Sequence, residues 1–316
     1  MTIEELTKEE KIIKRIEDGK IFKEQLDRIR VKLKDRYPNE PIGENFDTTI
    51  IANDLNDLYF KTILEGLKYG RLNYIDSGSF SGSYRVEFDS ANLIVNYPAT
   101  RPLGPTPRLG VEVTTNDDKI EEYFLNYLMD GSLRDKSSEQ DEEHYKYASW
   151  IVGIPEGMPL ESKGVPRGTR FNQLEWCINH FIEEGYGTNH CAITVGCAEG
   201  LQRYGWNKRG VGVEQGSTEC LRDVFLNIRA NKLDLTTIFR SWDLVAGLPE
   251  NLGGFAMVME YVVERINTDK RNKQTNIEIG KLKGYCPGLH IYSHNLNLAE
   301  AWTNLAEKKK EDVLEK

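Results

Sequence analysis

The feature that most constrains this chain is a run of contrasting patterns between residues 220 and 267. Two segments with strand character, CLRDVFLNIR and KLDLTTIF, meet around RANK at 229–232. The polar cluster RSWD follows directly, and a long apolar stretch, GGFAMVMEYVVERIN, begins after Asn251. Alternation with period two is typical of strands, and apolar residues at helical spacing are typical of a packed helix. The stretch therefore predicts two strands joined by a turn, then a polar loop, then a long helix.

The rest of the chain mixes helical and strand patterns without regular βαβ alternation. An α+β fold therefore fits better than a doubly wound sheet. Residues 1–40 predict one or two amphipathic helices that end near Pro38 and Pro41. Residues 77–98 predict a loop followed by a hairpin. Further helices are predicted over 56–70, over 117–132 from an aspartate cap, and before Gly185, with strands at 191–195 and in GLHIYSHN.

Composition excludes several classes of protein. The net charge of −9 argues against broad nucleic-acid binding, which needs a basic surface. No segment approaches about 18 uninterrupted apolar residues, so a membrane span is not expected. The charged N-terminus lacks the apolar core of a secretory signal. The five cysteines form no CxxC pair, which favours reduced thiols in a cytoplasmic protein, and the His and Cys positions lack metal-ligand spacing.

Four short segments resemble the thymidylate synthase family, which includes the pyrimidine nucleotide hydroxymethylases. They are Cys220 on a strand, RSWD at 240–243, GLPEN at 247–251 and HIYSHN at 290–295. The spacing needs no gap from Cys220 through Asn251, and the resemblance covers roughly residues 55–303. It implies a thymidylate-synthase-like domain over 51–316, preceded by an N-terminal helical extension over 1–50. It also implies a large mixed sheet packed with helices, and a homodimer built by packing sheets face to face.

The resemblance assigns the chemistry to three residues. The family transfers a one-carbon unit from 5,10-methylenetetrahydrofolate to C5 of a pyrimidine nucleoside 5′-monophosphate. Cys220 would supply the thiolate that adds to C6 and makes C5 nucleophilic, and a nearby guanidinium such as Arg240 would favour the thiolate. Tyr147 would assist proton removal from C5. An ungapped match puts Tyr123 where the family has its acid/base glutamate, so Glu122 is the candidate only if the helix start is shifted.

The resemblance also implies which residues bind substrate and cofactor. Arg240 and Ser241 would form part of a phosphate site, and Asp243 would face the pterin of the reduced folate. Asn251 would read the pyrimidine edge, because an amide can pair with both O4 and N3–H of uracil. His290 and Tyr292 would hold the sugar 3′-hydroxyl. Asn251 favours uracil, since cytosine-specific relatives carry Asp there, and Ser241 favours a deoxyribose, so dUMP is the expected substrate.

Simpler interpretations of the same residues stay open. Cys220 could be a half-buried strand residue, Arg240 an ordinary partner of Asp243, and the pair His290 and Tyr292 a packed strand end.

The sequence also departs from the family. Leu221 and Glu219 flank the cysteine where His and Pro are usual, and Gly288 replaces an Asp. Asn189 and His190 stand where paired arginines are expected. Arg240 is thus the one phosphate cation placed by the match. The candidates to replace the others are Arg85, Arg101, Arg203 and Arg209.

Three functions therefore remain possible from the sequence. The first is C5 methylation or hydroxymethylation of dUMP, two outcomes that differ in whether a hydride or water attacks the exocyclic methylene. The second is a CMP- or dCMP-type hydroxymethylase in a biosynthetic pathway. The third is a non-catalytic nucleotide-binding relative.

Overall fold

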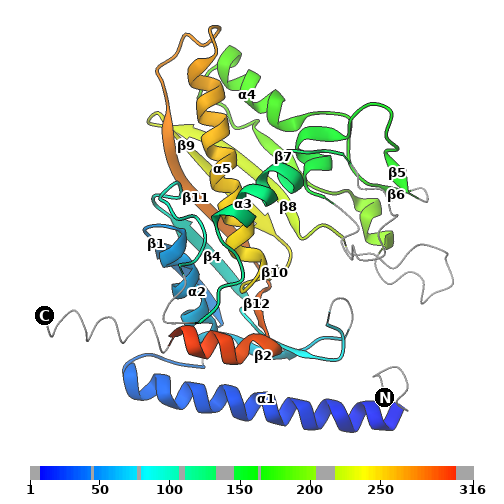
Figure 1. Cartoon of the computed structure of the whole chain (residues 1–316), viewed down its shortest axis with the longest axis vertical. Helices are drawn as coiled ribbons and strands as arrows, with labels where there is room; N and C mark the ends of the chain where they lie inside the picture. Colours follow the sequence, from blue (N-terminus) through cyan, green and yellow to red (C-terminus); the bar gives the residue numbers. More distant parts are fainter. Residues whose placement is uncertain are drawn as a thin grey trace, which may run out of the picture.

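A mixed sheet of six strands forms the centre of this computed structural model, in the order β1-β4-β11-β9-β8-β7 (Figure 1). The structure describes residues 8–43, 46–76, 80–106, 111–132, 146–162, 165–203 and 218–303. β1 is parallel to β4 and β11 is parallel to β9, whereas the other neighbouring pairs are antiparallel. The strands are β1 (Asp47–Ala52), β4 (Ser90–Val95), β7 (Ala192–Thr194), β8 (Leu221–Arg229), β9 (Lys232–Phe239) and β11 (Glu278–Cys286).

The hairpin of β8 and β9 confirms the predicted strand pair. Its two-residue turn is formed by Ala230 and Asn231, whose φ angles are 48° and 56°. Positive φ at both turn residues matches the right-handed twist of the flanking strands. At the other end of the hairpin Leu221 pairs with Phe239. The residues just beyond this pair, Cys220 and Arg240, are therefore brought together.

Helices cover the buried face of this sheet. They are α2 (Leu55–Tyr69), α4 (Gln173–Glu184) and α5 (Gly247–Thr268), and Figure 1 shows α5 running along the central strands. The alternate residues of β9 that face the helices, such as Leu233 and Leu235, are fully buried. α5 begins at Gly247, earlier than the predicted start after Asn251. Pro249 is tolerated there because the first turn of a helix has no partners for its N–H groups, and Asn251 consequently lies inside the helix.

The small residues of α5 allow α3 (Asp117–Tyr123) to cross it closely. A Cβ added to Gly253 would lie 2.7 Å from Ile120, and one added to Gly254 would lie 2.8 Å from Tyr123. α3 continues as a π-helical turn, Phe124–Leu128. Its N-cap is Asn116, whose side chain accepts from the N–H of Lys119, so the predicted aspartate cap is wrong by one residue. The close crossing brings Tyr123 next to the start of α5.

A second sheet of four strands, in the order β10-β12-β3-β2, adjoins the first. The predicted hairpin over 77–98 is wrong, because β3 belongs to this sheet whereas β4 belongs to the large one. The chain changes sheets at Phe88, which is buried and whose N–H donates to the carbonyl of Leu289. The strands are β2 (Arg71–Tyr74), β3 (Tyr84–Glu87), β10 (Trp242–Asp243) and β12 (Leu289–Tyr292).

The N-terminal helix α1 (Lys8–Arg36) lies across one end of the molecule, next to helical residues 296–303 (Figure 1). It confirms the helix predicted before Pro38. Leu26, Ile29 and Leu33 are buried against the rest of the chain, and the Arg30 guanidinium donates to the carbonyls of Leu67 and Gly70. The proposed boundary at residue 50 falls within β1, so the division into 1–50 and 51–316 stays a prediction.

The other face of the large sheet carries side chains that are half-buried or exposed. The strand register aligns these side chains in two rows across all six strands. We call this surface the outer face. One row is Ala192, Phe225, Thr236, Lys283, Ile94 and Ile51; the other is Thr194, Asp223, Ile238, Tyr285, Asn92 and Thr49. Both rows contain apolar as well as polar residues.

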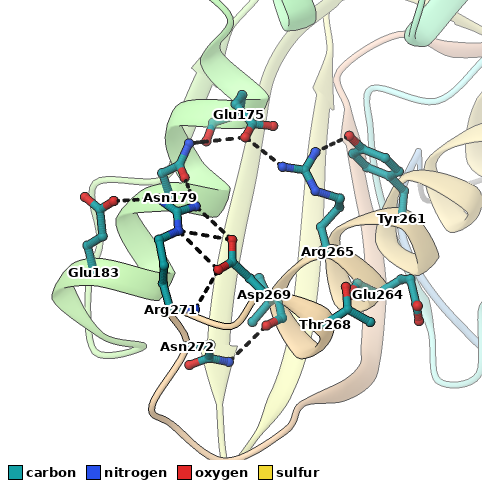
Figure 2. Close-up of polar contacts among 11 residues, drawn as sticks. Glu175, Asn179, Glu183, Tyr261, Glu264, Arg265, Thr268, Asp269, Arg271 and Asn272 are labelled. Carbon is teal, nitrogen blue, oxygen red and sulfur yellow. Dashed lines mark hydrogen bonds and ion pairs between the residues drawn. The ribbon is translucent and has the colours of Figure 1, made fainter.

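Ion pairs fasten the far end of α5 to α4 (Figure 2). Arg265 contacts Glu175 at 2.7 Å, and Arg271 contacts Glu183 at 3.0 Å and Asp269 at 2.8 Å. These pairs are at least partly exposed, so each contributes little alone, but together they fix where the chain leaves α5 for β11.

The architecture confirms the predicted α+β class, with a large mixed sheet packed with helices. Within the described residues, no helix has the length and apolar character needed to cross a membrane.

Candidate active site

Cys220 and Arg240 lie side by side where β8 begins and β9 ends. The backbone N–H of Arg240 donates to the carbonyl of Cys220 at 2.8 Å. The Arg240 guanidinium turns back toward the residues before the cysteine and donates to the carbonyls of Thr218 (2.7 Å) and Glu219 (3.2 Å). Cys220 itself is half-buried. A partly accessible thiol with a cation on the adjoining strand has the surroundings typical of a reactive cysteine.

Tyr147 lies on the other side of the cysteine. Its phenolic oxygen accepts a hydrogen bond from the backbone N–H of Leu221 at 3.3 Å. The ring is buried and makes edge-to-face contacts with the rings of Tyr127 (ring centroids 5.1 Å apart) and Phe239 (6.3 Å). Tyr147 precedes a second π-helical turn, Ser149–Gly153. Such turns are often found at functional sites.

The Asn251 side chain lies between two aromatic residues. Its Oδ1 accepts from the indole Nε1–H of Trp242 at 2.9 Å, and its Nδ2 donates to the hydroxyl of Tyr123 at 2.8 Å. Tyr123 stacks on Tyr127, which in turn contacts Tyr147. The amide and the tyrosine beside the cysteine are thus connected through packed rings.

Glu122 does not join this group. Its side chain is exposed. Its negative charge contributes, after burial and the charge of Asp243, to the raised pKa of Glu250 in the first turn of α5. The contact with Asn251 is made instead by the neighbouring Tyr123, the residue that the ungapped match indicates.

His290 and Tyr292 lie on β12, next to β10. The His290 ring is 2% exposed, and its Nδ1–H donates to the carbonyl of Gly288 at 2.8 Å. Burial lowers the pKa of His290 to about 4, so the ring is neutral at pH 7 and Nε2 is an acceptor. Nε2 is buried and has no hydrogen-bond partner among the described residues. Burial raises the pKa of Tyr292 to about 12, so the phenol stays protonated.

Asp243 pairs with His290 in the β10–β12 ladder. Its Oδ1 accepts from the backbone N–H of Val245 at 2.9 Å. Burial nevertheless raises the pKa of this carboxyl, and the positive charge of His294 opposes the rise. Ser241, two residues earlier, is half-buried.

Sequence similarity to known proteins shows the family of this chain. Two proteins named "Putative thymidylate synthase" are each 33% identical to this chain. The one from Methanosarcina mazei matches over 251 residues, 79% of this chain and 92% of its own length. The one from Methanosarcina acetivorans matches over 219 residues, 69% of this chain and 79% of its own length. No protein-family model matches the sequence.

The chain belongs to the thymidylate synthase family.

Membership in the thymidylate synthase family implies a pyrimidine nucleotide and a folate cofactor as ligands, and enzymatic activity of that class. Among the residues described here, no group of three or more His, Cys, Asp or Glu side chains is arranged to hold a metal ion.

The four candidate phosphate cations have different surroundings. Arg85 pairs with Tyr292 in the β3–β12 ladder, contacts Glu87 at 2.8 Å, and adds to the effect of burial in lowering the pKa of His290. Arg101 is partly exposed and contacts Glu260. Arg203 ends the 3₁₀ turn Ala198–Arg203. Arg209 lies outside the described residues. Arg85 therefore lies next to the candidate site, through its pairing with Tyr292.

Sequence analysis missed three residues of the site. Trp242, inside the RSWD motif, contacts Asn251. Glu219 is fully buried and accepts from the indole Nε1–H of Trp150 at 3.0 Å. Cys286 is buried; burial raises its pKa to about 12, and the charges of Cys220 and Glu87 add to this. The position of Trp242 in the motif and the position of Glu219 directly before Cys220 were signals, whereas nothing local marked Cys286.

Proposed function

We propose that this protein transfers a one-carbon unit from 5,10-methylenetetrahydrofolate to C5 of a pyrimidine nucleoside 5′-monophosphate, dUMP in the first place. The observation that carries the proposal is the hydrogen bond from the N–H of Arg240 to the carbonyl of Cys220. It holds the backbones of a half-buried cysteine and an arginine together at the end of one hairpin, and Trp242, two residues after the arginine, contacts the Asn251 amide. A nucleophile, an anion-binding group and a base-reading group are what the reaction needs in one place.

The proposed reaction begins at the sulfur of Cys220. Its thiolate adds to C6 of the pyrimidine, and the C5–C6 electron pair moves to make C5 a nucleophile. C5 then forms a bond to the one-carbon unit and loses its proton, and breaking of the bond between that unit and a folate nitrogen leaves an exocyclic methylene on C5. Attack of a hydride or of water on this methylene, together with breaking of the C6–sulfur bond, restores the C5–C6 double bond and releases the thiolate. Tyr147 is the candidate to assist that proton removal, because its hydroxyl lies at the backbone of the residue after Cys220.

Nucleotide binding is assigned to residues of the β9–β10 connection, of β12 and of α5. Arg240 and Ser241 would bind the 5′-phosphate. Asn251 would bind the base. His290 and Tyr292 would bind the sugar 3′-hydroxyl, and the state of His290 supports this. A neutral imidazole with a buried, unpartnered Nε2 needs an O–H donor, and a sugar hydroxyl supplies one.

The folate is assigned to the surroundings of Asp243. Burial raises the pKa of this carboxyl, and N–H groups of a bound folate would offset the cost of burying its negative charge. When bound, the reduced folate supplies the one-carbon unit and, for a methyl product, the hydride. The exposed side chain of Glu122 does not support its role as acid/base.

The outer face supports a homodimer built from sheets packed face to face. Its two rows place Phe225, Ile238, Ile94 and Tyr285 on a surface that a second copy of the chain would cover. A sheet normally buries an apolar face against another layer.

The decisive experiment is release of tritium from C5 of labelled nucleotide in the presence of the reduced folate. We expect release from [5-³H]dUMP, and we expect the Cys220→Ser variant to reduce it by roughly 10³-fold or more. Cys197→Ser is the matched control, because Cys197 is also half-buried and is assigned no role. Release from labelled dCMP or CMP rather than dUMP would indicate the hydroxymethylase alternative. Nucleotide binding without release would indicate a non-catalytic relative.

Identification of the product distinguishes the two C5 transfers. Mass spectrometry of the nucleotide would show either a 5-methyl or a 5-hydroxymethyl group. Full activity of Cys220→Ser would contradict the mechanism proposed here.

A further inference from the structure

The Asn251 amide has one position filled on each of its two polar atoms. Oδ1 accepts from Trp242, and Nδ2 donates to Tyr123. An amide oxygen has two acceptor positions and an amide nitrogen has two N–H groups. One acceptor position and one N–H therefore remain for a ligand. The orientation of the amide plane decides where the ligand meets the acceptor and where it meets the N–H.

Trp242 decides the orientation of the amide. An indole N–H can only donate, so the atom that faces it must be the oxygen. Turning the amide by 180° would set its NH₂ group against the indole N–H and leave two buried donors without acceptors. Because Asn251 is 9% exposed and Trp242 is 2% exposed, water would not compensate this loss.

The contact with Tyr123 does not determine the orientation of the Asn251 amide. A phenol both donates and accepts, so the hydroxyl can face either the nitrogen or the oxygen of the amide. The two contacts of Asn251 are therefore unequal: the indole specifies the orientation, and the phenol accommodates it.

The indole is itself held firmly. Its ring stacks on Phe239, with centroids 3.9 Å apart and planes 12° apart. The backbone N–H of Trp242 donates to the carbonyl of Gly288 at 3.1 Å. Gly284 lies against the far side of the ring, where an added Cβ would be 2.9 Å from Cζ3. The ring has no room to turn its N–H away from Asn251.

We propose that Trp242 is the positioning residue that makes this site select uracil over cytosine. With Oδ1 fixed by the indole, the remaining acceptor and donor of the amide complement N3–H and O4 of uracil. Cytosine offers an acceptor at N3 and a donor at N4, the reverse pattern, and would require the forbidden orientation. This inference rests on the proposed function only in assuming that the pyrimidine edge contacts Asn251.

The test compares dUMP and dCMP affinities of three variants by calorimetry. Trp242→Phe keeps a ring on Phe239 and removes the N–H, so the amide is free to turn; we expect the ratio of the two affinities to fall by roughly tenfold or more. Tyr123→Phe keeps the indole, so we expect weaker binding of dUMP with preference for dUMP retained. Trp302→Phe is the control, since its buried indole donates instead to the carbonyl of Glu112.

The outcomes separate this inference from the proposed function. If the wild type binds neither nucleotide, the nucleotide site itself is wrong. If it prefers dUMP and Trp242→Phe keeps the full preference, or if Tyr123→Phe loses it equally, the role of the indole is overturned. Equal binding of both nucleotides by the wild type also overturns it. Thermal unfolding of each variant, compared with Trp302→Phe, shows whether a change in affinity reflects loss of folding. If Trp242→Phe does not fold, Trp242→His replaces it, because the histidine ring can accept as well as donate a hydrogen bond.

Discussion

The phenolic oxygen of Tyr147 lies 3.3 Å from the backbone nitrogen of Leu221, the residue that follows Cys220. This contact ties the segment before α4 to the start of β8. The hydroxyl is thereby held at a fixed position relative to the cysteine. A group that must remove or relay a proton during a reaction at the cysteine benefits from such a fixed position.

Tyr147→Phe should slow tritium release from dUMP by roughly 10²-fold, a typical loss for a group that assists proton transfer. The nucleotide affinity should change little, because the ring and its contacts with Tyr127 and Phe239 remain. Unfolding should cost about 1 kcal/mol less, since the N–H of Leu221 loses its acceptor. Tyr127→Phe is the control. Equal rates for Tyr147→Phe and wild type would show that this hydroxyl has no part in the proton transfer.

Arg240→Lys tests the phosphate site. Lysine keeps the positive charge but cannot make the forked contacts of a guanidinium. It also cannot reach the carbonyls of Thr218 and Glu219 in the same way. We expect the KM for dUMP to rise by roughly tenfold or more. Arg265→Lys, at a partly exposed ion pair with Glu175, should leave KM unchanged. An unchanged KM in Arg240→Lys, with a loss of stability alone, would indicate a purely structural arginine.

Much of this site could be predicted because it lies in one ungapped stretch. The distance from Cys220 to Arg240 follows from two strands and a two-residue turn, and the sequence alternation indicates both. The contact between Tyr123 and Asn251 could not be predicted, because it depends on how closely α3 crosses α5. That crossing is set by Gly253 and Gly254, whose lack of side chains matters only once Ile120 and Tyr123 are in place.

The predicted hairpin over 77–98 failed for a related reason. β3 and β4 are separated by two residues, as in a hairpin, yet they belong to different sheets. Hydrogen bonds from Phe88 to Leu289 and from Asp89 to Phe46 guide the chain from one sheet to the other. Both partners are distant in sequence, so local patterns carry no trace of them.

The buried His290 should make the protein sensitive to acid. Its pKa is lowered to about 4 in the folded chain, mainly by burial, and returns to its ordinary value of 6.5 on unfolding. Between these values the unfolded chain binds the proton and the folded chain does not. The free energy of unfolding is therefore not reduced by this group above pH 6.5, and it falls as the pH is lowered further. Near pH 4 the loss relative to pH 7 is about 3 kcal/mol.

Urea unfolding at pH 7 and pH 4.5 measures this effect. In His290→Gln, which cannot titrate, the loss of stability between the two pH values should be smaller than in the wild type. His180→Gln is the control, since His180 lies on the partly exposed face of α4. The idea fails if His290→Gln and the wild type lose the same amount.

The outer face provides a test of the dimer. Ile238 lies in the middle of one row, between Asp223 and Tyr285 on the neighbouring strands. Ile238→Lys would place a charge at the centre of the proposed interface and should weaken self-association by at least roughly tenfold. Light scattering after size exclusion measures the mass in solution. Ile21→Lys, at a residue of α1 that is 60% exposed, should leave the mass unchanged. A wild-type protein that is monomeric at micromolar concentration would contradict the dimer.

Buried side chains hold α1 against the rest of the chain. Leu33 on α1 is 2% exposed, whereas Val31, two residues earlier, is 60% exposed. Leu33→Ala should reduce the free energy of unfolding by about 2–5 kcal/mol, the usual cost of emptying a buried leucine site. Val31→Ala should change it by less than about 0.5 kcal/mol.

The number of transitions in the unfolding curve shows whether α1 unfolds together with the rest of the chain. Because Arg30 bonds to the carbonyls of Leu67 and Gly70 at the end of α2, we expect α1 to unfold together with the main domain in one transition. Circular dichroism and tryptophan fluorescence should therefore give coincident curves in urea, both shifted equally by Leu33→Ala. Two separate transitions, with only the first moved by Leu33→Ala, would instead make residues 1–50 an independent helical attachment whose loss leaves the site intact.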